Sequence, residues 1–363
     1  GLPKHFKIMA HTFGGYPSSI YEGIDFQAVA EMADVVGYDG SVYAVFLDFF
    51  RSLAPDKVLM NSEAKFKWMN ADDMSRDLWI AAVLGVDAQV IWLWDPPWGS
   101  WGRMENYMLQ QPTGLHAGGK STLDIQRLMP QIYAISRTEP EVRFLFSTAS
   151  RVNEYEAYND ATNAAHDMAS RAGVTLGFWT ERQLQDRDWA KTRLLILAGC
   201  SSIEPDSALA LEQFIADGGE IMLVGEVPTT DVYGKPLPKK LQQYFDNTTH
   251  YGLNDDGELL TLEIGDMLDT MHHAGVEMPL QFTDAQGNDS DAAFARWVES
   301  DEGVYIFVTA PQGEYEPVTV KANWKGKPLQ GLNLINHQPV DGELLVKPGN
   351  EYLIEVGASA AAN

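Results

Sequence analysis

The sequence has a single cysteine, Cys200, which excludes an internal disulfide and any metal site built from several cysteines. Basic residues are also few, because 26 Lys and Arg stand against 51 Asp and Glu for a formal charge of -25. Such a charge repels nucleic acid and anionic membranes, so neither is an expected partner. No apolar run is long enough to cross a bilayer, so no membrane-spanning segment is expected.

The chain begins Gly1-Leu2-Pro3-Lys4-His5, which is neither a signal peptide nor a Met start. We therefore expect a processed or truncated product, and the compartment stays open between the cytoplasm and the periplasm of a bacterium. At 363 residues the chain can hold two or three domains with a substantial core. No glycine-rich loop matches a nucleotide fingerprint, and we expect no cofactor and no metal site.

The first third of the chain alternates between strand and helix patterns. Apolar strand patterns cover residues 6–10, 35–38, 58–60 and 87–94, and helical spacing covers residues 25–32, 42–53 and 72–84. The last of these helices has acidic residues in its first turn, where the helix dipole favours them. Four strands alternating with helices predict parallel βα units, which amount to half of an eight-stranded barrel.

Glu63 falls just past the end of the unbroken apolar run Val58-Leu59-Met60. Such a run is typical of a strand in a parallel sheet covered on both faces. In a barrel of this kind, the C-terminal ends of the strands hold the catalytic groups. Glu63 is therefore the leading candidate for a catalytic carboxylate. The alternative is a solvated loop residue, or one paired with Lys65 or Lys67.

Four tryptophans gather around the fourth strand. Trp92 and Trp94 alternate and so point to the same side, whereas Trp98 and Trp101 lie on the Pro- and Gly-rich loop beyond. Indole rings pack against the C–H faces of sugars, and core burial explains the loop pair poorly. We expect at least one of the four to stack on a ligand. The equally weighted alternative is a core pair, Trp92 and Trp94, with two exposed aromatic side chains on the loop.

Two further candidates end the first two strands. His11 and Tyr38 could orient Glu63 or bind substrate hydroxyls. A buried histidine or tyrosine in the core is an equally weighted alternative for each.

The middle of the chain predicts a second α/β unit. Strands are expected at residues 142–147, 174–179, 194–198 and 220–224, with helices at 155–172 and 205–217. This is a small, doubly wound, flavodoxin-like layout. Cys200 follows a strand, near where a class-I amidotransferase-like domain places its nucleophile, but no nucleophile elbow and no partner histidine accompany it.

The remaining segments have no chemical signature. The stretch Gly114–Thr122 is rich in turn residues and predicts a linker, followed by an amphipathic helix at 123–135. From about residue 255, short alternating runs separated by Gly, Pro and Asn predict a small antiparallel β domain. We therefore expect domains at 1–140, 141–254 and 255–363.

This order of a half-barrel, an amidotransferase-like domain and a small β domain resembles the C-terminal portion of glycoside hydrolase family 42 β-galactosidases and related clan A exo-glycosidases. The resemblance covers most of the chain. It is most specific in the trimerisation domain and in the linker that leaves the barrel, which correspond to residues 142–147, 173–182, 194–199, 214–219 and 113–120.

The resemblance implies a retaining glycoside hydrolase acting on β-galactosides or related oligosaccharides such as marine galactans. The four N-terminal strands become barrel strands five to eight, and Glu63 takes the nucleophile position. Retaining hydrolysis needs a second carboxyl group about 5–5.5 Å away. In this clan the second carboxyl group, the acid/base, is a Glu that follows an Asn at the end of barrel strand four. This chain has no strand four. Its Asn153-Glu154 pair lies in the amidotransferase-like domain and is not that motif.

The resemblance therefore implies two partners: an N-terminal half-barrel polypeptide that carries the acid/base, and further copies of this chain in a homotrimer. Two other functions stay open. One is a non-catalytic carbohydrate-binding or assembly subunit with a degenerate site. The other is an amidotransferase-like enzyme that uses Cys200.

Overall fold

The computed structural model describes residues 9–12, 24–65, 70–92, 111–186, 188–189, 191–252, 263–313 and 315–358. The fold is mixed α/β and divides into two compact units. The first unit holds the described residues up to Thr138 together with those from Pro279 onward, and the second holds Glu139–Met278. The division into three domains stays a prediction.

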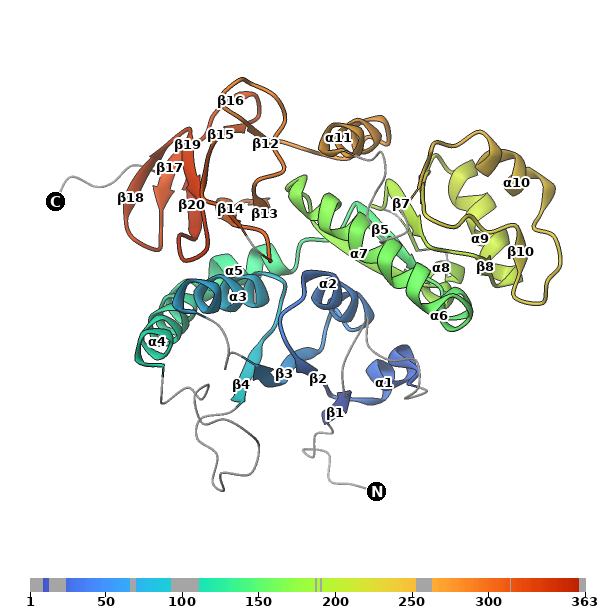
Figure 1. Ribbon diagram of the computed structural model, residues 1–363, viewed down its shortest axis with the longest axis horizontal. Helices are drawn as coiled ribbons and strands as arrows, with labels where there is room; N and C mark the ends of the chain where they lie inside the picture. Colours follow the sequence, from blue (N-terminus) through green and yellow to red (C-terminus); the bar gives the residue numbers. More distant parts are fainter. Residues whose placement is uncertain are drawn as a thin grey trace. The chain divides into compact units, whose positions relative to one another are not determined.

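The first unit begins with a four-stranded parallel sheet in the order β1-β2-β3-β4 (Figure 1). Its strands are β1 (Met9–Thr12), β2 (Val35–Gly40), β3 (Val58–Lys65) and β4 (Ala88–Trp92), and the helices between them are α1 (Phe26–Met32), α2 (Ala44–Leu53) and α3 (Ala71–Val83). The helices and the second and fourth strands lie within two residues of their predicted bounds. The first strand is described over Met9–Thr12, against a prediction of residues 6–10, and the third runs to Lys65 and not only to Met60.

The helices pack against one face of this sheet. Tyr38 on β2 meets Phe46 and Phe50 of α2 at ring-centroid distances of 4.9 Å and 6.2 Å. Ala64 on β3 packs with Met74 and Leu78 of α3. Because side chains alternate along a strand, the residues between these positions face the other way.

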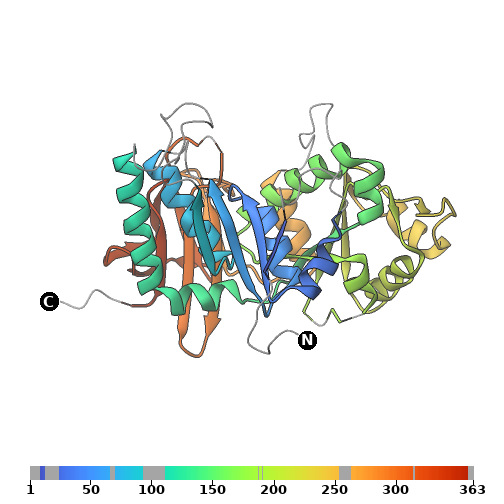
Figure 2. The same ribbon diagram turned by 90° about the horizontal axis from the view of Figure 1, so that it is seen from below.

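We call that other side of the sheet the open face; it carries Val35, Gly37, Asp39, Val58, Met60, Glu63, Ala88 and Val90. Figure 2 looks onto this side, and no described helix lies in front of the strands. Val58 and Val90 leave 43% and 47% of their surface exposed there. Valines on neighbouring strands of a parallel sheet are normally covered by other elements. We therefore expect a further layer of protein to pack on this face.

One prediction for the first unit is wrong. The stretch Gly114–Thr122 is helical, inside α4 (Pro112–Arg127), which is followed by α5 (Met129–Ser136). Gly114 and Gly118 lie one turn apart and are buried against α3; a Cβ on Gly118 would lie 3.0 Å from the sulfur of Met74. The glycines therefore allow two helices to approach closely, a tertiary benefit that outweighs their poor helix propensity.

The C-terminal residues of the first unit form two antiparallel sheets around a shared core. The first sheet contains β12 (Leu280–Thr283), β15 (Val318–Trp324), β16 (Lys327–Pro328) and β19 (Glu343–Val346). The second contains β13 (Phe294–Ser300), β14 (Gly303–Thr309), β20 (Tyr352–Val356), β17 (Gln330–Asn333) and β18 (Gln338–Asp341).

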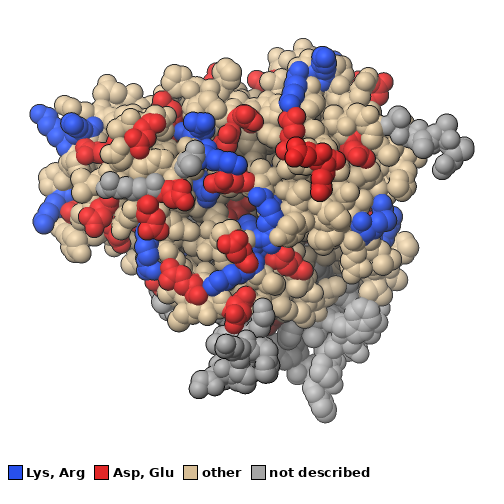
Figure 3. Space-filling model, turned by 180° about the vertical axis from the view of Figure 1, so that it is seen from behind, with Lys and Arg blue, Asp and Glu red and all other residues tan. Residues whose placement is uncertain are grey.

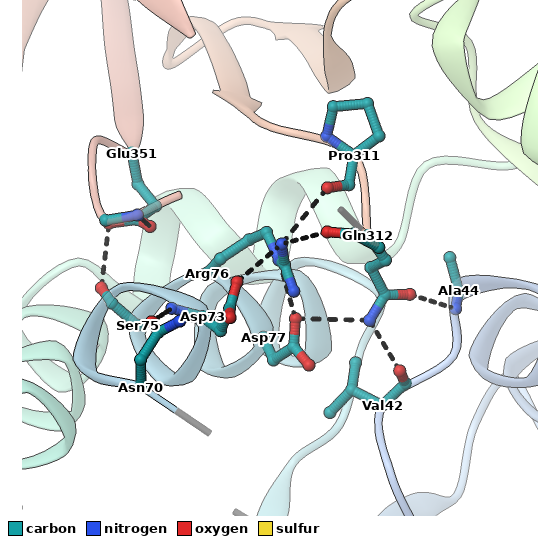
Figure 4. Close-up of polar contacts among 12 residues, drawn as sticks. Val42, Ala44, Asn70, Asp73, Ser75, Arg76, Asp77, Pro311, Gln312 and Glu351 are labelled. Atoms are coloured by element: carbon teal, nitrogen blue, oxygen red, sulfur yellow. Dashed lines mark hydrogen bonds and ion pairs between the residues drawn. The ribbon is translucent and has the colours of Figure 1, made fainter. Parts of the chain in front are cut away.

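Buried and half-buried polar contacts tie these sheets to the helices of the parallel sheet (Figure 4). Arg76 of α3 pairs with Asp77 at 2.9 Å and donates to the carbonyl of Pro311 at 3.4 Å. The side chain of Gln312 donates to the carbonyl of Val42 at 2.6 Å and accepts from the amide of Ala44 at 3.1 Å. Gln312 thus caps the start of α2, where the residue at the N-cap has no side-chain hydrogen bond of its own.

The second unit is a five-stranded parallel sheet in the order β11-β9-β7-β5-β6. Its strands are β5 (Val142–Phe146), β6 (Leu176–Thr180), β7 (Leu194–Ala198), β9 (Glu220–Val224) and β11 (His250–Tyr251), and β8 (Ser202–Ile203) pairs separately with β10 (Thr230–Asp231). Its helices are α6 (Thr148–Asn153), α7 (Tyr155–Arg171), α8 (Glu181–Gln185), α9 (Pro205–Ala216), α10 (Lys239–Asp246) and α11 (Ile264–His273). Counted along the chain, the order is 2-1-3-4-5, as in flavodoxin-like sheets.

Candidate functional site

Glu63 lies inside β3, two residues before its last residue, Lys65, and not in a loop beyond the strand as predicted. The strand is longer than its apolar run because it is bulged: its pairing with β2 shifts between Tyr38 and Asp39, and its pairing with β4 shifts between Asn61 and Ala64. Bulges re-aim side chains and are frequent beside active sites. The side chain of Glu63 is half-buried on the open face.

Asp39 is the neighbour of Glu63 across the sheet. The two residues are register partners on β2 and β3, so their backbones lie about one strand spacing, roughly 4.8 Å, apart. Asp39 is 6% exposed and shares the open face with Glu63. The sequence analysis missed this residue, although an Asp at the end of the second strand was a signal of the same kind as Glu63.

Asn61 and Ser62 hold the two strands together where the regular ladder is interrupted. The Asn61 amide donates to the carbonyl of Gly40 at 3.0 Å, and its oxygen accepts from the amide of Glu63 at 3.1 Å. The Ser62 hydroxyl donates to the carbonyl of Tyr38 at 2.9 Å. Asn61 is fully buried, so these bonds fix the backbone of Glu63 against that of β2. Neither residue was a candidate from the sequence.

Tyr38 is placed on the helix side of the sheet, away from Glu63. It is fully buried among Phe46 and Phe50, and burial raises the pKa of its hydroxyl well above the usual range. A ring in this position supports the strand and has no route to a substrate on the open face. The alternative of a packed core tyrosine describes this placement.

The other predicted substrate contacts are described only in part or not at all. His11 lies on β1 opposite Gly37, and Trp92 lies at the end of β4 opposite Lys65, with backbone positions only. Trp94, Trp98 and Trp101 lie outside the described residues. Their roles stay predictions.

Cys200 is fully buried in the second unit. Burial raises the pKa of its thiol far above the usual range, and the nearby Glu181 carboxylate adds to this. A catalytic cysteine needs the opposite environment, one that favours the thiolate. This placement disfavours the amidotransferase-like alternative.

Among the described residues, no three His, Cys, Asp or Glu side chains are grouped in a way that could hold a metal ion. None of the helices in the described part of the chain has the length and apolar character needed to cross a membrane. Figure 3 shows Asp and Glu spread over one face of the molecule, with Lys and Arg lying among them. Many of the acidic side chains are therefore exposed on this face.

No protein-family model matches the sequence, and no curated protein matches it. Solved structures do match in three dimensions. An exo-carrageenase of glycoside hydrolase family 42 from Bacteroides ovatus is 15% identical with a TM-score of 0.71, and the match covers 92% of this chain and 49% of that one. A β-galactosidase from Bacillus circulans sp. alkalophilus is 14% identical with a TM-score of 0.69, covering 97% of this chain and 64% of that one.

A β-galactosidase from the Antarctic haloarchaeon Halorubrum lacusprofundi is 13% identical with a TM-score of 0.64, again covering 64% of its own length. The chain thus spans about half to two thirds of these structures. Identities this low establish likeness of fold alone. The resemblance seen in the sequence is confirmed at the level of the fold. The fold of this chain matches about half to two thirds of the structure of glycoside hydrolase family 42 enzymes.

Proposed function

We propose that this protein is part of a retaining glycoside hydrolase acting on β-galactosides or related galactan oligosaccharides, with Glu63 as the nucleophile. The observation that carries the proposal is the position of Glu63. It lies on the open face near the carboxyl end of a parallel strand, with its backbone fixed by Asn61, in a chain folded like family 42 enzymes. Carboxyl ends of parallel barrel strands are where catalytic groups are held.

The acid/base belongs to the half of the barrel outside this sequence. Retaining hydrolysis places two carboxyl groups on either side of the glycosidic bond, about 5–5.5 Å apart. Asp39 is beside Glu63 on the adjacent strand and faces the same way, so it is poorly placed to protonate a leaving group from the opposite side. A carboxylate across the barrel from Glu63 meets the requirement.

The exposed valines of the open face support the same conclusion. Val58 and Val90 lose their exposure only when something packs on this side of the sheet. Four further βα units, on the same polypeptide or on a separate one, would cover them and close the barrel. We also propose that the second unit assembles the protein as a homotrimer, and that His11, Trp92, Trp94, Trp98 and Trp101 contact the sugar.

The test combines mass spectrometry with a substitution. Intact-mass analysis of active material asks whether four further barrel units accompany this sequence. In that active form we expect Glu63→Ala to lower kcat by about 10⁴-fold or more, the usual scale for loss of a nucleophile. Added azide should restore turnover and give a glycosyl azide of inverted configuration, because a small anion replaces the missing carboxylate.

Glu31→Ala is the matched control, because Glu31 is an exposed carboxylate on α1, away from the open face, and its loss should leave kcat unchanged. A fluorosugar that traps the glycosyl-enzyme should label Glu63. Labelling of another carboxylate would overturn the assignment. Full turnover in Glu63→Ala would favour the carbohydrate-binding or assembly role instead.

A further inference from the structure

A groove of about 560 Å³ opens in the second unit, at the edge of its parallel sheet. Its walls come from the start of β9, the end of α10, the segment that leads into β11, and α11. The lining side chains that matter below are Glu220, Tyr244, Asn247, Tyr251, Asp269 and His273. The volume lies in the range of small-molecule sites, about 300–1,000 Å³.

The groove exists because β11 is short. It pairs only with Leu223 and Val224, so in the described chain the first three residues of β9 have no strand on that side. Tyr244 closes part of this edge. The amide of Ile221 donates to the Tyr244 hydroxyl at 3.3 Å, and that hydroxyl donates to the Glu220 carboxylate at 3.0 Å.

These two hydrogen bonds determine which groups on this wall of the groove donate and which accept. Burial, with the Glu220 carboxylate next to it, raises the pKa of Tyr244 to about 12, so the hydroxyl stays protonated and keeps donating. The carboxylate of Glu220 offers about four acceptor positions and the relay occupies one of them. The ring of Tyr244 is held in place at the wall of the groove by its two hydrogen bonds.

The remaining lining groups select a neutral, hydroxyl-rich ligand. Asp269 and Glu220 provide carboxylate acceptors, Asn247 provides an amide, and no Lys or Arg is among the described lining residues. Two carboxylates with no Lys or Arg in the described lining disfavour anions, and His273 is the basic side chain of that lining. Tyr244 and Tyr251 provide aromatic surface of the kind that packs against the C–H groups of a sugar ring.

We propose that this groove is a saccharide-binding site for a neutral mono- or disaccharide, separate from the site around Glu63. It shares no residue with β3 and does not depend on the proposed glycosidase activity. A peptide strand adding to the sheet edge is disfavoured, because the Ile221 amide that it would pair with is already bonded to Tyr244.

The probes for the test are galactose and lactose, titrated at millimolar concentration into the full chain. Hydrogen–deuterium exchange mass spectrometry should show added protection in residues 239–251 and 264–273, which locates binding to this groove. Asp269→Ala should weaken this binding about tenfold, the scale of one hydrogen bond to a charged group, and Tyr251→Ala should weaken it by about as much through loss of the aromatic surface. Tyr251 is one of the two residues of β11, so its replacement could disturb that strand. Asp269 lies on the helix α11, and Asp269→Ala is therefore the variant less liable to affect folding.

Asp160→Ala is the matched control, because Asp160 is an exposed aspartate within a helix, α7, that does not line the groove. Glu63→Ala should also leave the protection at this groove unchanged, so failure of the glycosidase proposal does not affect this one. Unchanged binding in Asp269→Ala, or no protection of these segments in the parent protein, would overturn the proposal. A change in oligomeric state on Asp269→Ala without saccharide binding would assign the groove to contact between copies of the chain.

Discussion

Asp48 and Arg296 form a buried ion pair whose removal tests how the first unit is held together. Asp48 lies on α2 and Arg296 on β13, 248 positions apart in the sequence. Their side chains are 6% and 1% exposed, and the Arg296 Nη2 to Asp48 Oδ2 distance is 3.1 Å. The guanidinium also lies 4.5 Å from the centre of the Phe294 ring.

We expect Asp48→Ala to lower the free energy of unfolding by about 3–5 kcal/mol, because it leaves a buried cation without its counter-charge. Burial already lowers the pKa of Arg296, and Asp48 is the charge that opposes this. A loss of about 4 kcal/mol reduces the folding equilibrium constant roughly 10³-fold. The measurement is urea unfolding followed by tryptophan fluorescence, with hydrogen exchange in residues 44–53 and 294–300 to locate the loss.

Two comparisons make this result interpretable. The double variant Asp48→Leu/Arg296→Met removes both charges and should cost less than Asp48→Ala alone, because apolar pairs of similar volume replace buried ion pairs at little cost. Glu299→Ala removes an exposed pair with Lys325, at 47% and 54% exposure, and should cost less than about 1 kcal/mol. An Asp48→Ala loss as small as that of Glu299→Ala would refute the reasoning.

Two more predictions concern the half-buried Gln312 and the buried Cys200. Gln312→Leu removes the hydrogen bonds to Val42 and Ala44 and should lower the free energy of unfolding by about 1–3 kcal/mol; an unchanged urea midpoint would show that Gln312 does not hold the start of α2. Cys200 should not react with Ellman's reagent in the native protein and should react fully in urea, because it is buried and its pKa is raised; rapid native reaction would contradict its placement.

The sequence predicted the elements better than it predicted the site. The strand at 194–198 has the bounds that were expected, because an unbroken apolar run between Arg193 and Gly199 marks both of its ends. The third strand was predicted too short, because Asn61, Ser62 and Glu63 are polar and only their pairing across the bulge keeps them in the sheet. Polar residues within a strand interrupt the apolar run, so the local sequence does not show that the strand continues through them.

Tyr38 and Asp39 illustrate the same limit at the candidate site. They are adjacent in the sequence, and the one that was chosen as a ligand contact is packed under α2, whereas the other lies beside Glu63. Which of two neighbouring residues faces the helices depends on strand register, and one step of register exchanges the two faces.

The sequence by itself determined the parallel α/β layout, the place of Glu63 near the end of a strand, the acidic surface and the absence of a disulfide within the chain. Its local periodicity and composition are sufficient for these features, because they depend on residues close together in the chain. Only the tertiary structure decided that Gly114 and Gly118 belong to a helix, and that Arg296 pairs with Asp48. Those outcomes depend on burial and on contacts between distant segments, whose free energy exceeds local preference once the chain has packed.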